Sequence, residues 1–378
     1  MADLAQGVFS KEMSTYDLYT TPVPKETWDV PANGAARFSW EYDDGRQRLL
    51  DLYQRGKDKQ WDAAKRIDWD QEIDPYNVMG TAPEMNPIFG SPQYEKLNDA
   101  ERDELSRNIS AWLFSQFLHG EQGALTVAAR IVESVPDMDS KFYAATQTMD
   151  EARHVELFNR FTHEKIGLFY PVNPDLAQLL GDALSDSRWD MPYLGMQVLI
   201  EGLALAAFGV HRELATTPLV KQLLAYVMQD EARHVAFGRL ALRDYYAQLT
   251  AAELADREEF VVEGCYLMRN RFIMREVWEH MGYDVAQCVD FSDKSPTQQI
   301  FRNLLFSRIV PCVKDIGLWG PKVQHAYVDL GVIDAADSDL DALMNSDEAI
   351  ADRLEAEHAA TLVARKQEVD DVIAEAVG

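Results

Sequence analysis

The chain has 378 residues, and 63 aspartates and glutamates outnumber its 36 lysines and arginines, giving a formal net charge of −27 at pH 7. This acidic balance argues against phosphate backbones and anionic membrane surfaces as partners. The apolar content of 47% is ordinary for a soluble protein with a large core. Three well-separated cysteines (Cys265, Cys288 and Cys312) predict a reducing compartment, without a disulfide framework or a thiolate metal site.

Residues 1–97 mix proline, tryptophan, aspartate and tyrosine in irregular order, and we expect them to form an extension packed on the main body. Helices are expected at about residues 36–57 and 59–67. Three tryptophans are expected to anchor the extension by core packing: Trp40, Trp61 and Trp69. The first residues lack the basic start and apolar stretch of a signal peptide, which predicts a cytoplasmic protein.

The pattern changes at Asn98, which has Glu101 three residues later, the spacing of a capping box. A helix is expected to run from there to Pro136, and a second to end at Gly167. Four long helices are expected in all, at residues 98–135, 139–166, 189–215 and 217–249. They predict an all-α protein with a four-helix bundle at residues 98–250, and a short helix at residues 175–184 in the connector between the two pairs.

Residues 251–378 are expected to add helices that complete the same domain. Amphipathic patterns predict helices at residues 251–281 and 297–315, and residues 317–331 read as a loop or short helix. The tail at residues 339–377 has a helical period but few aromatic residues. A packed helix, an oligomer contact and a partly disordered tail all agree with that pattern.

Residues 191–210 are apolar over a length that could cross a membrane. Glu201 lies at the centre of this stretch, and Pro192 and several glycines interrupt it. An ionisable side chain at the bilayer centre is costly, so a buried core helix is the better interpretation. We therefore expect no membrane span.

The hexapeptide Asp-Glu-Ala-Arg-His-Val occurs twice, at residues 150–155 and 230–235, an offset of 80 residues. Glu121 and Glu201, both in apolar surroundings, are also 80 residues apart, and the same offset aligns residues 112–133 with 192–213. Such an internal repeat predicts two helix pairs related by a pseudo-twofold axis. The axis would bring the four glutamates of the repeat to one central point.

Glu and His three residues apart lie on one face of a helix, with Cβ atoms roughly 5–6 Å apart. Glu151 with His154 can therefore hold one metal ion, and Glu231 with His234 a second. Each of the other two helices supplies one more glutamate, which completes a shell or bridges both ions. The expected metal ligands and catalytic residues are Glu121, Glu151, His154, Glu201, Glu231 and His234. Hard oxygen donors with imidazole suit iron or manganese, and the lack of thiolate disfavours zinc or copper.

The alternative is that Glu151 and Glu231 lie on solvated faces and that the histidines are ordinary core residues. Glu121 and Glu201 disfavour it, because a lone carboxylate in an apolar helix is costly to bury. Four flanking residues are expected to support the ligands: Asp150, Asp230, Arg153 and Arg233. Asp150 precedes His154 by four residues and is expected to accept the distal imidazole N–H, as Asp230 is for His234. The arginines are expected to pair with these aspartates or with carboxylates of the partner helix.

Residues 98–250 resemble the ferritin-like di-iron carboxylate superfamily, especially its oxygen-activating members. These include the small subunit of ribonucleotide reductase, the multicomponent monooxygenase hydroxylases and the di-iron arylamine N-oxygenases. The resemblance implies a ferritin-like four-helix bundle core with additional N- and C-terminal helices. It also implies one iron on Glu121, Glu151 and His154, a second on Glu201, Glu231 and His234, and a homodimer.

Three positions depart from members of this superfamily. Phe158 stands where the reductase subunit has its radical-forming tyrosine, which disfavours a tyrosyl radical. Leu205 stands where the hydroxylases often have threonine, which makes the pocket more apolar. Val227 stands where the N-oxygenases carry an extra histidine ligand, which weakens an N-oxygenase assignment.

The sequence thus predicts a di-iron oxygenase that activates O₂ and oxygenates a small apolar or aromatic substrate. Two iron ions are expected, with a mixed Mn/Fe pair as an alternative, and electrons are expected from an external ferredoxin or flavin reductase. Residues one helical turn from the ligands are expected to line the substrate pocket: Phe117, Phe158, Gln197, Leu205 and Phe208. A two-electron oxidase or desaturase on the same centre, and a non-catalytic iron-handling protein, stay open as alternatives.

Overall fold

The computed structural model describes residues 9–10, 30–31, 33–42, 45–357 and 359–360. Regular structure in this part of the chain is helical apart from one short antiparallel pair, in which β1 (Phe9–Ser10) lies beside β2 (Leu168–Phe169). The predicted all-α class is therefore confirmed. The tail beyond residue 360, whose state the sequence left open, lies outside the described residues.

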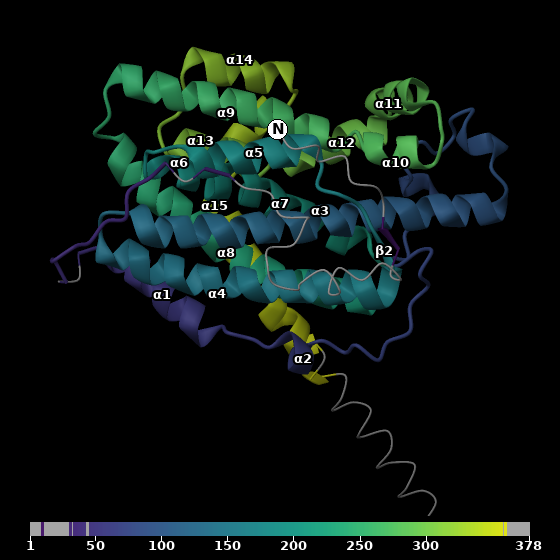
Figure 1. Ribbon diagram of the computed structural model, residues 1–378, viewed down its shortest axis with the longest axis horizontal. Helices are drawn as coiled ribbons and strands as arrows, with labels where there is room; N and C mark the ends of the chain where they lie inside the picture. Colours follow the sequence, from purple (N-terminus) through teal and green to yellow (C-terminus); the bar gives the residue numbers. More distant parts are fainter. Residues whose placement is uncertain (1–8, 11–29, 32, 43–44, 358, 361–378) are drawn as a thin grey trace, which may run out of the picture.

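The centre of the molecule is a bundle of four long helices (Figure 1). Its members are α3 (Asp99–Ser134), α4 (Met138–Phe161), a continuous helix made of α6 (Asp190–Tyr193), η5 (Leu194–Ile200) and α7 (Glu201–Leu214), and α8 (Pro218–Tyr246). The closest pairings are α3 with α4 and α7 with α8, the two pairs that the repeat predicts. The segment η5 is a π-helix, which the sequence pattern did not predict.

Local signals set where these helices begin. The Asn98 side chain accepts a hydrogen bond from the Glu101 amide, and the Glu101 carboxylate accepts one from the Asn98 amide, so the predicted capping box is formed. Asp137 caps α4 through the Ser140 amide. Pro218 occupies the first turn of α8, where its missing N–H leaves no helical bond unmade.

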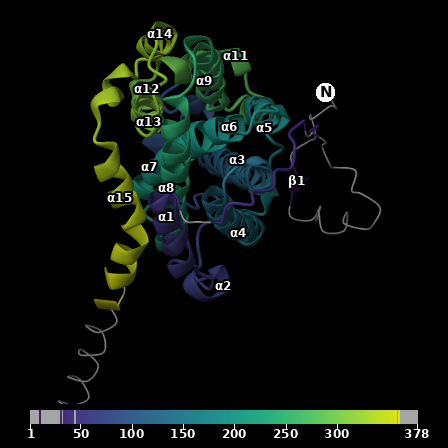
Figure 2. The same ribbon diagram turned by 90° about the vertical axis from the view of Figure 1, so that its left-hand side faces the viewer.

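Further helices surround the bundle (Figures 1 and 2). On one side α1 (Gln47–Asp58) packs against α4 and α8, with α2 (Ala63–Arg66) following it, and α15 (Leu340–Glu348) runs along α8. On the other side α5 (Pro174–Ser185) packs against α9 (Ala251–Arg271), and α14 (Pro321–Asp329) covers α9. The remaining segments are η2 (Pro83–Met85), η3 (Tyr94–Lys96), η4 (Thr162–Ile166), α10 (Arg275–His280), α11 (Val285–Lys294), α12 (Pro296–Leu305), α13 (Ile309–Asp315) and η6 (Ile333–Asp337).

Several boundaries differ from the expectations outside the bundle. The helix predicted from residue 36 begins only at Gln47, and the second N-terminal helix is a single turn. Trp61 and Trp69 are buried as predicted, but Trp40 is 82% exposed, so its anchoring role is wrong. The helix predicted at residues 251–281 breaks at Met274, which has a left-handed φ of 55°. That at residues 297–315 is divided into α12 and α13.

The apolar helix that raised the membrane question spans Asp190–Leu214. Its most apolar window has a mean hydropathy of 1.6, and 83% of that window is buried inside the structure. Within the described residues it is therefore the central helix of a protein core, as the buried Glu201 suggested.

Candidate metal centre

Six side chains converge at the middle of the bundle, one or two from each long helix. Glu121 comes from α3, Glu151 and His154 from α4, Glu201 from the first turn of α7, and Glu231 and His234 from α8. All six are buried, the most accessible being Glu121 at 5%. Their donor atoms form two clusters in which the atoms lie within 4.8 Å of one another, and Glu151 belongs to both. The structure thus brings together every residue that the repeat singled out.

The first cluster is built around Nδ1 of His154. This nitrogen lies 3.2 Å from Oε2 of Glu121, 3.3 Å from Oε2 of Glu151 and 3.2 Å from Oε1 of Glu231. Three carboxylates from three helices therefore face one ring nitrogen. Oxygen donors with one imidazole are a donor set suited to iron or manganese.

The second cluster contains His234, Glu151 and Glu201. Nδ1 of His234 lies 3.1 Å from Oε1 of Glu151 and 3.5 Å from Oε1 of Glu231. The Gln147 amide, one turn before Glu151, donates hydrogen bonds to Oε1 of Glu151 at 2.9 Å and to Oε1 of Glu201 at 2.8 Å. Gln147 therefore ties α4 to α7 across the centre.

The residues present fit a pair of cations. Five buried donor atoms lack a hydrogen-bond partner: Oε2 of Glu151, Oε2 of Glu201, both carboxylate oxygens of Glu231 and Nδ1 of His234. With every carboxylate ionised and both histidines neutral, the charged residues of the centre are its four glutamates, two aspartates and two arginines, which leaves an excess of four negative charges. Unpaired buried polar atoms and charges are costly, and two divalent cations would satisfy both deficits.

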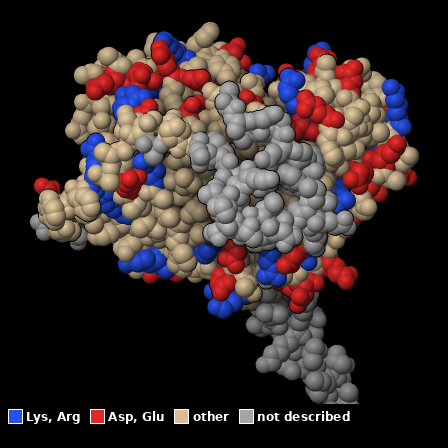
Figure 3. Space-filling view, viewed as in Figure 1, with Lys and Arg blue, Asp and Glu red and all other residues tan. Residues whose placement is uncertain are grey.

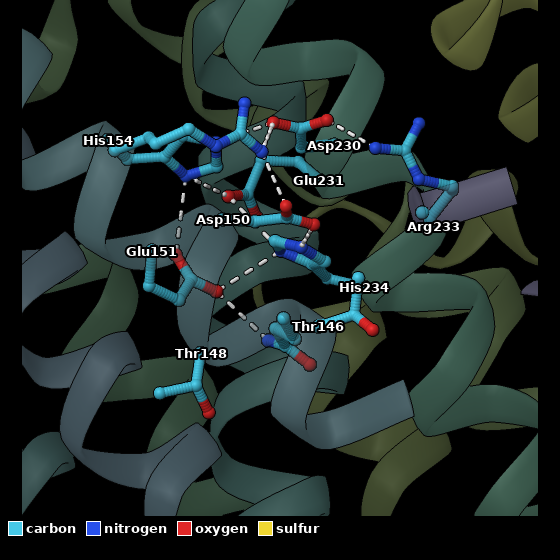
Figure 4. A network of polar contacts seen from close by, with 12 residues as sticks. Thr146, Thr148, Asp150, Glu151, His154, Asp230, Glu231, Arg233 and His234 are labelled. Carbon is cyan, nitrogen blue, oxygen red and sulfur yellow. Dashed lines mark hydrogen bonds and ion pairs between the residues drawn. The ribbon is translucent and has the colours of Figure 1, made fainter. Parts of the chain in front are cut away.

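The histidines are held by aspartates in a crossed arrangement (Figure 4). Nε2 of His154 lies 3.1 Å from Oδ2 of Asp230, and Nε2 of His234 lies 3.2 Å from Oδ2 of Asp150. The expected pairing of each histidine with the aspartate of its own hexapeptide is therefore wrong. Because α4 and α8 face each other here, each imidazole points its distal nitrogen at the opposite helix. A carboxylate in this position fixes the orientation of the ring and the nitrogen that faces the centre.

Two arginines and an N-terminal segment surround these aspartates. Arg153 donates to Asp150 and, at 3.1 Å, to Asp230, while Arg233 donates to Asp230. The Trp61 indole donates to Oδ2 of Asp230 at 2.8 Å, and the Gln60 amide, from the same segment, donates to Oδ1 of Asp150 at 2.8 Å. Nothing in the sequence pattern pointed to Gln60 or to a polar contact of Trp61, because their partners lie 90 and 169 residues away.

The protonation equilibria of the centre are strongly displaced. Burial raises the pKa of Glu121 and Glu201 well above the ordinary value, and the charge of Glu231 adds to the effect. Burial opposes the charge of Glu151, yet contacts with His234 and His154 lower its pKa. Burial likewise opposes protonation of both histidines, but the surrounding carboxylates raise the pKa of each. Cations in the centre would replace these shared protons.

A small cavity adjoins the carboxylates between α3 and α7. Glu121, Glu201 and Glu231 form one part of its wall, and Phe117 and Phe208 form another, with ring centroids 4.7 Å apart. Phe158 packs behind them, with its ring 5.6 Å from that of Phe117. The other two residues expected in the pocket are also buried away from the cavity lining: Gln197, whose amide contacts Gln147 at 3.4 Å, and Leu205. The cavity volume is about 30 Å³.

No curated protein matches this chain significantly. Among solved structures it is similar to a mutant form of an R2-like ligand-binding oxidase with a Mn/Fe cofactor, at 17% identity and a TM-score of 0.45 over 74% of this chain and 100% of that chain. A second mutant form of that oxidase matches at 18% identity and a TM-score of 0.43, with the same coverage.

A family comparison covers much more of the chain than the bundle alone. The family described as P-aminobenzoate N-oxygenase AurF matches residues 42–317, well over half of the sequence. The expectation that Val227, buried one turn before Glu231, weakens an N-oxygenase assignment is therefore wrong. The match confirms the resemblance to oxygen-activating di-iron carboxylate proteins. The chain belongs to the AurF family of p-aminobenzoate N-oxygenases, and with it to the non-haem di-iron oxygenases.

Proposed function

We propose that this protein is a di-iron N-oxygenase that uses O₂ to oxygenate a small aromatic amine. One oxygen atom enters an N–H bond of the amine, and the other leaves as water with two protons and two electrons. An external ferredoxin or flavin reductase supplies the electrons. The observation that carries the proposal is the pair of buried clusters that share Glu151, with five unpartnered donor atoms facing the centre.

In this proposal Glu121, Glu151 and His154 would hold one iron, and Glu201, Glu231 and His234 would hold the other. Glu151 and Glu231 each lie against Nδ1 of both histidines, so either carboxylate would be within reach of both ions. The metal pair supplies the site at which O₂ binds and is activated. A mixed Mn/Fe pair could use the same donor set.

The remaining residues of the centre orient the ligands and exclude water. Asp230 and Asp150 hold the two histidines with Nδ1 toward the centre. Gln147 fixes one oxygen of Glu151 and one of Glu201, which leaves the other oxygen of each unpartnered. The aromatic wall of Phe117 and Phe208 keeps the cavity beside the centre apolar on the substrate side. An apolar wall favours an aromatic ring and disfavours bulk water near the carboxylates.

Metal analysis combined with turnover tests the proposal. Protein reconstituted with Fe(II) is expected to hold two irons per chain and, with a reductase present, to consume O₂ in step with product formed from an aromatic amine. Glu121→Ala is expected to lose both metal and turnover. Glu133→Ala, on the same helix but with a half-exposed side chain, is the matched control and should keep both.

The alternatives give different products. A two-electron oxidase or desaturase would consume O₂ without placing labelled oxygen from ¹⁸O₂ in the product. An iron-handling protein would take up O₂ only to oxidise its iron, whichever amine is added. Either result would refute the N-oxygenase.

We also propose that the protein is a cytoplasmic homodimer. Sedimentation of the metal-loaded protein tests whether it is a dimer.

A further inference from the structure

A second cavity, much larger than the one beside the carboxylates, lies where α3 begins and α7 ends. Its volume is about 630 Å³, compared with about 30 Å³ for the small cavity. Its wall is built from the first half of α3, the last turn of α7, α12 and residues 77–95. Small-molecule sites have volumes of roughly 300–1,000 Å³. A ring-sized molecule therefore has room in this larger cavity, which we call the chamber, and not in the small one.

The chamber and the small cavity follow one another along the same faces of α3 and α7. On α3, Leu113 lines the chamber, whereas Phe117 and Glu121 line the small cavity. On α7, His211 lines the chamber and Phe208 lines the small cavity. Residues three or four apart share one face of a helix, so these side chains form two continuous rows. On α3 the row runs from Leu113 to the expected metal ligand Glu121, about 12 Å along the helix axis.

Four aromatic side chains, which we call the partition, separate the two cavities. Phe117 and Phe272 line the small cavity, and His211 and Phe301 line the chamber. The ring centroid of His211 lies 6.0 Å from that of Phe117 and 5.5 Å from that of Phe301. The centroid of Phe301 lies 5.7 Å from that of Phe272. Packed aromatic pairs have centroids roughly 4.5–7 Å apart, so these rings are in direct contact. Side chains thus divide the cavities here, and a change of their rotamers would join them.

His211 places a polar group at this boundary without a protein partner. The residue is 8% exposed, and within the described residues its Nε2 has no hydrogen-bond partner. Burial lowers the pKa of His211 to about 4, so the imidazole is neutral at pH 7. A neutral imidazole has one nitrogen that accepts a hydrogen bond and one that donates. A buried nitrogen without a partner is costly, and an amine N–H in the chamber would supply the missing donor.

We propose that the chamber is the entry site of the aromatic amine, and that His211 binds the amine there before it reaches the metal centre. The amine N–H donates to Nε2 of His211 while the ring packs against Phe301. Rotation of the partition side chains then admits the ring to the small cavity, which is too small for it in the present arrangement. The inference rests on the proposed function, since the amine is the substrate of the same centre. It adds a binding site outside the carboxylate clusters.

Crystallography with a brominated amine tests the position of this site. Iron-loaded wild type is crystallised without O₂, which prevents turnover, and the crystals are soaked with 4-bromoaniline. Anomalous scattering is expected to show bromine in the chamber, close to His211. Bromine only beside the carboxylates, or nowhere in the protein, overturns the entry site.

Stopped-flow fluorescence of the same anaerobic protein measures the order of events. The observed binding rate should level off as the amine concentration rises, because passage through the partition follows binding in the chamber. In His211→Phe, which keeps a ring and removes the acceptor, the half-saturating concentration should rise about 2- to 10-fold, the loss expected for one neutral hydrogen bond. An unchanged half-saturating concentration overturns the role of His211.

Ile109→Trp fills part of the chamber and has a matched control. Ile109 lies in the chamber wall and is partly buried, so a larger side chain there narrows the chamber. This variant should lose the bromine from the chamber and should bind and release the amine more slowly. Ile300→Trp makes the same replacement at a residue that is 62% exposed and lies outside the chamber lining, and it should behave like wild type. Thermal unfolding of each variant shows whether the fold is intact.

The results separate this site from the proposed function. Equal binding rates in Ile109→Trp and Ile300→Trp overturn the entry site, even when the amine is oxygenated at the centre. Bromine in the chamber and slower binding in Ile109→Trp, without any oxygenated product, support the site and contradict the N-oxygenase. The wild-type crystal decides the position of the site even if a variant fails to fold.

Discussion

Among single residues, the two aspartates that contact the histidines test the crossed arrangement directly. Asp230 holds His154 of the first cluster, and Asp150 holds His234 of the second. Asp230→Asn is therefore expected to lower metal affinity at the site formed with His154, by about 10- to 100-fold, because the charged acceptor that orients the ring becomes a neutral amide. Anomalous scattering from crystals grown at limiting Mn²⁺ reports the occupancy of each site separately. Asp150→Asn is the matched control and should deplete the other site. Depletion of the same-helix histidine's site in each variant would contradict the crossing.

His211 gives a prediction about stability and pH. It is buried in α7 between the rings of Phe117 and Phe301, its Nε2 has no partner, and burial lowers its pKa to about 4. Unfolding restores an ordinary pKa near 6.5, so the unfolded state binds a proton first as the pH falls. The free energy of unfolding should therefore be highest above pH 6.5 and decline toward pH 4, with a loss of up to about 3 kcal/mol that comes from His211. In His211→Leu the free energy of unfolding, measured with urea between pH 7 and 4, should depend less on pH. Parallel curves for the two proteins would show that the pKa of His211 is the same in the folded and the unfolded protein.

The sequence identified the six central residues because they repeat, but it could not identify most of their supporting contacts. The spacing of Glu and His three residues apart is a local property of a helix, so it can be read without tertiary structure. Gln147 carried a weak local signal, four residues before Glu151 on the same face. Trp61 and Gln60 reach the centre only through packing of distant segments, which no spacing along the chain reveals.

Among the elements, the π-helix η5 depends on close packing against α8. A Cβ on Gly238 would lie 2.5 Å from Cβ of Gln197, which is too close to accommodate without displacing η5. Gly238→Ala is therefore expected to destabilise the protein by about 1–3 kcal/mol and to disturb the segment that leads into Glu201. Gly181→Ala, in α5 with nothing within 4 Å of the added carbon, is the matched control and should be neutral or stabilising by up to about 1 kcal/mol. Thermal unfolding and metal content measure both effects. Equal melting temperatures for the two variants would show that η5 can move away without cost.

The long helices were predictable, and their interruptions were not. Capping residues and prolines mark the ends of α3, α4 and α8, and these ends agree with the structure to within a few residues. The break at Met274 lacks such a signal, since Phe272 and Met274 are buried apolar residues that continue a helical period. Tertiary packing there overrides local propensity. The π-helix is equally hard to predict from sequence. Its wider turns change which residues share a face, but every residue of η5 is buried and apolar residues occur on all sides, so the hydrophobic pattern does not change.

At the scale of the whole molecule, acidic residues lie both on the surface and in the buried centre of the bundle. The formal net charge is −27, and on the face drawn in Figure 3 acidic and basic side chains are interspersed among uncharged ones. Exposed charges are screened by salt within about 10 Å. The carboxylates of the bundle centre are buried, and salt screens them far less. Metal ions and ordinary salt should therefore affect stability through different groups.

Removing metal should consequently lower the stability of the whole protein. At metal concentrations of about 100 to 1,000 times Kd, binding to the folded state adds about 3–4 kcal/mol, so the melting temperature of Fe(II)- or Mn(II)-loaded protein should exceed that of chelated protein. In Glu151→Gln/Glu231→Gln two of the buried charges are absent. This variant lacks two of the expected metal ligands, so it should gain little from metal. Calorimetry of the two proteins, each with and without metal, measures both changes. KCl at matched ionic strength is the control for surface screening. If KCl reproduced the wild-type shift, the gain would come from the acidic surface, and the bundle centre would not be the cation site.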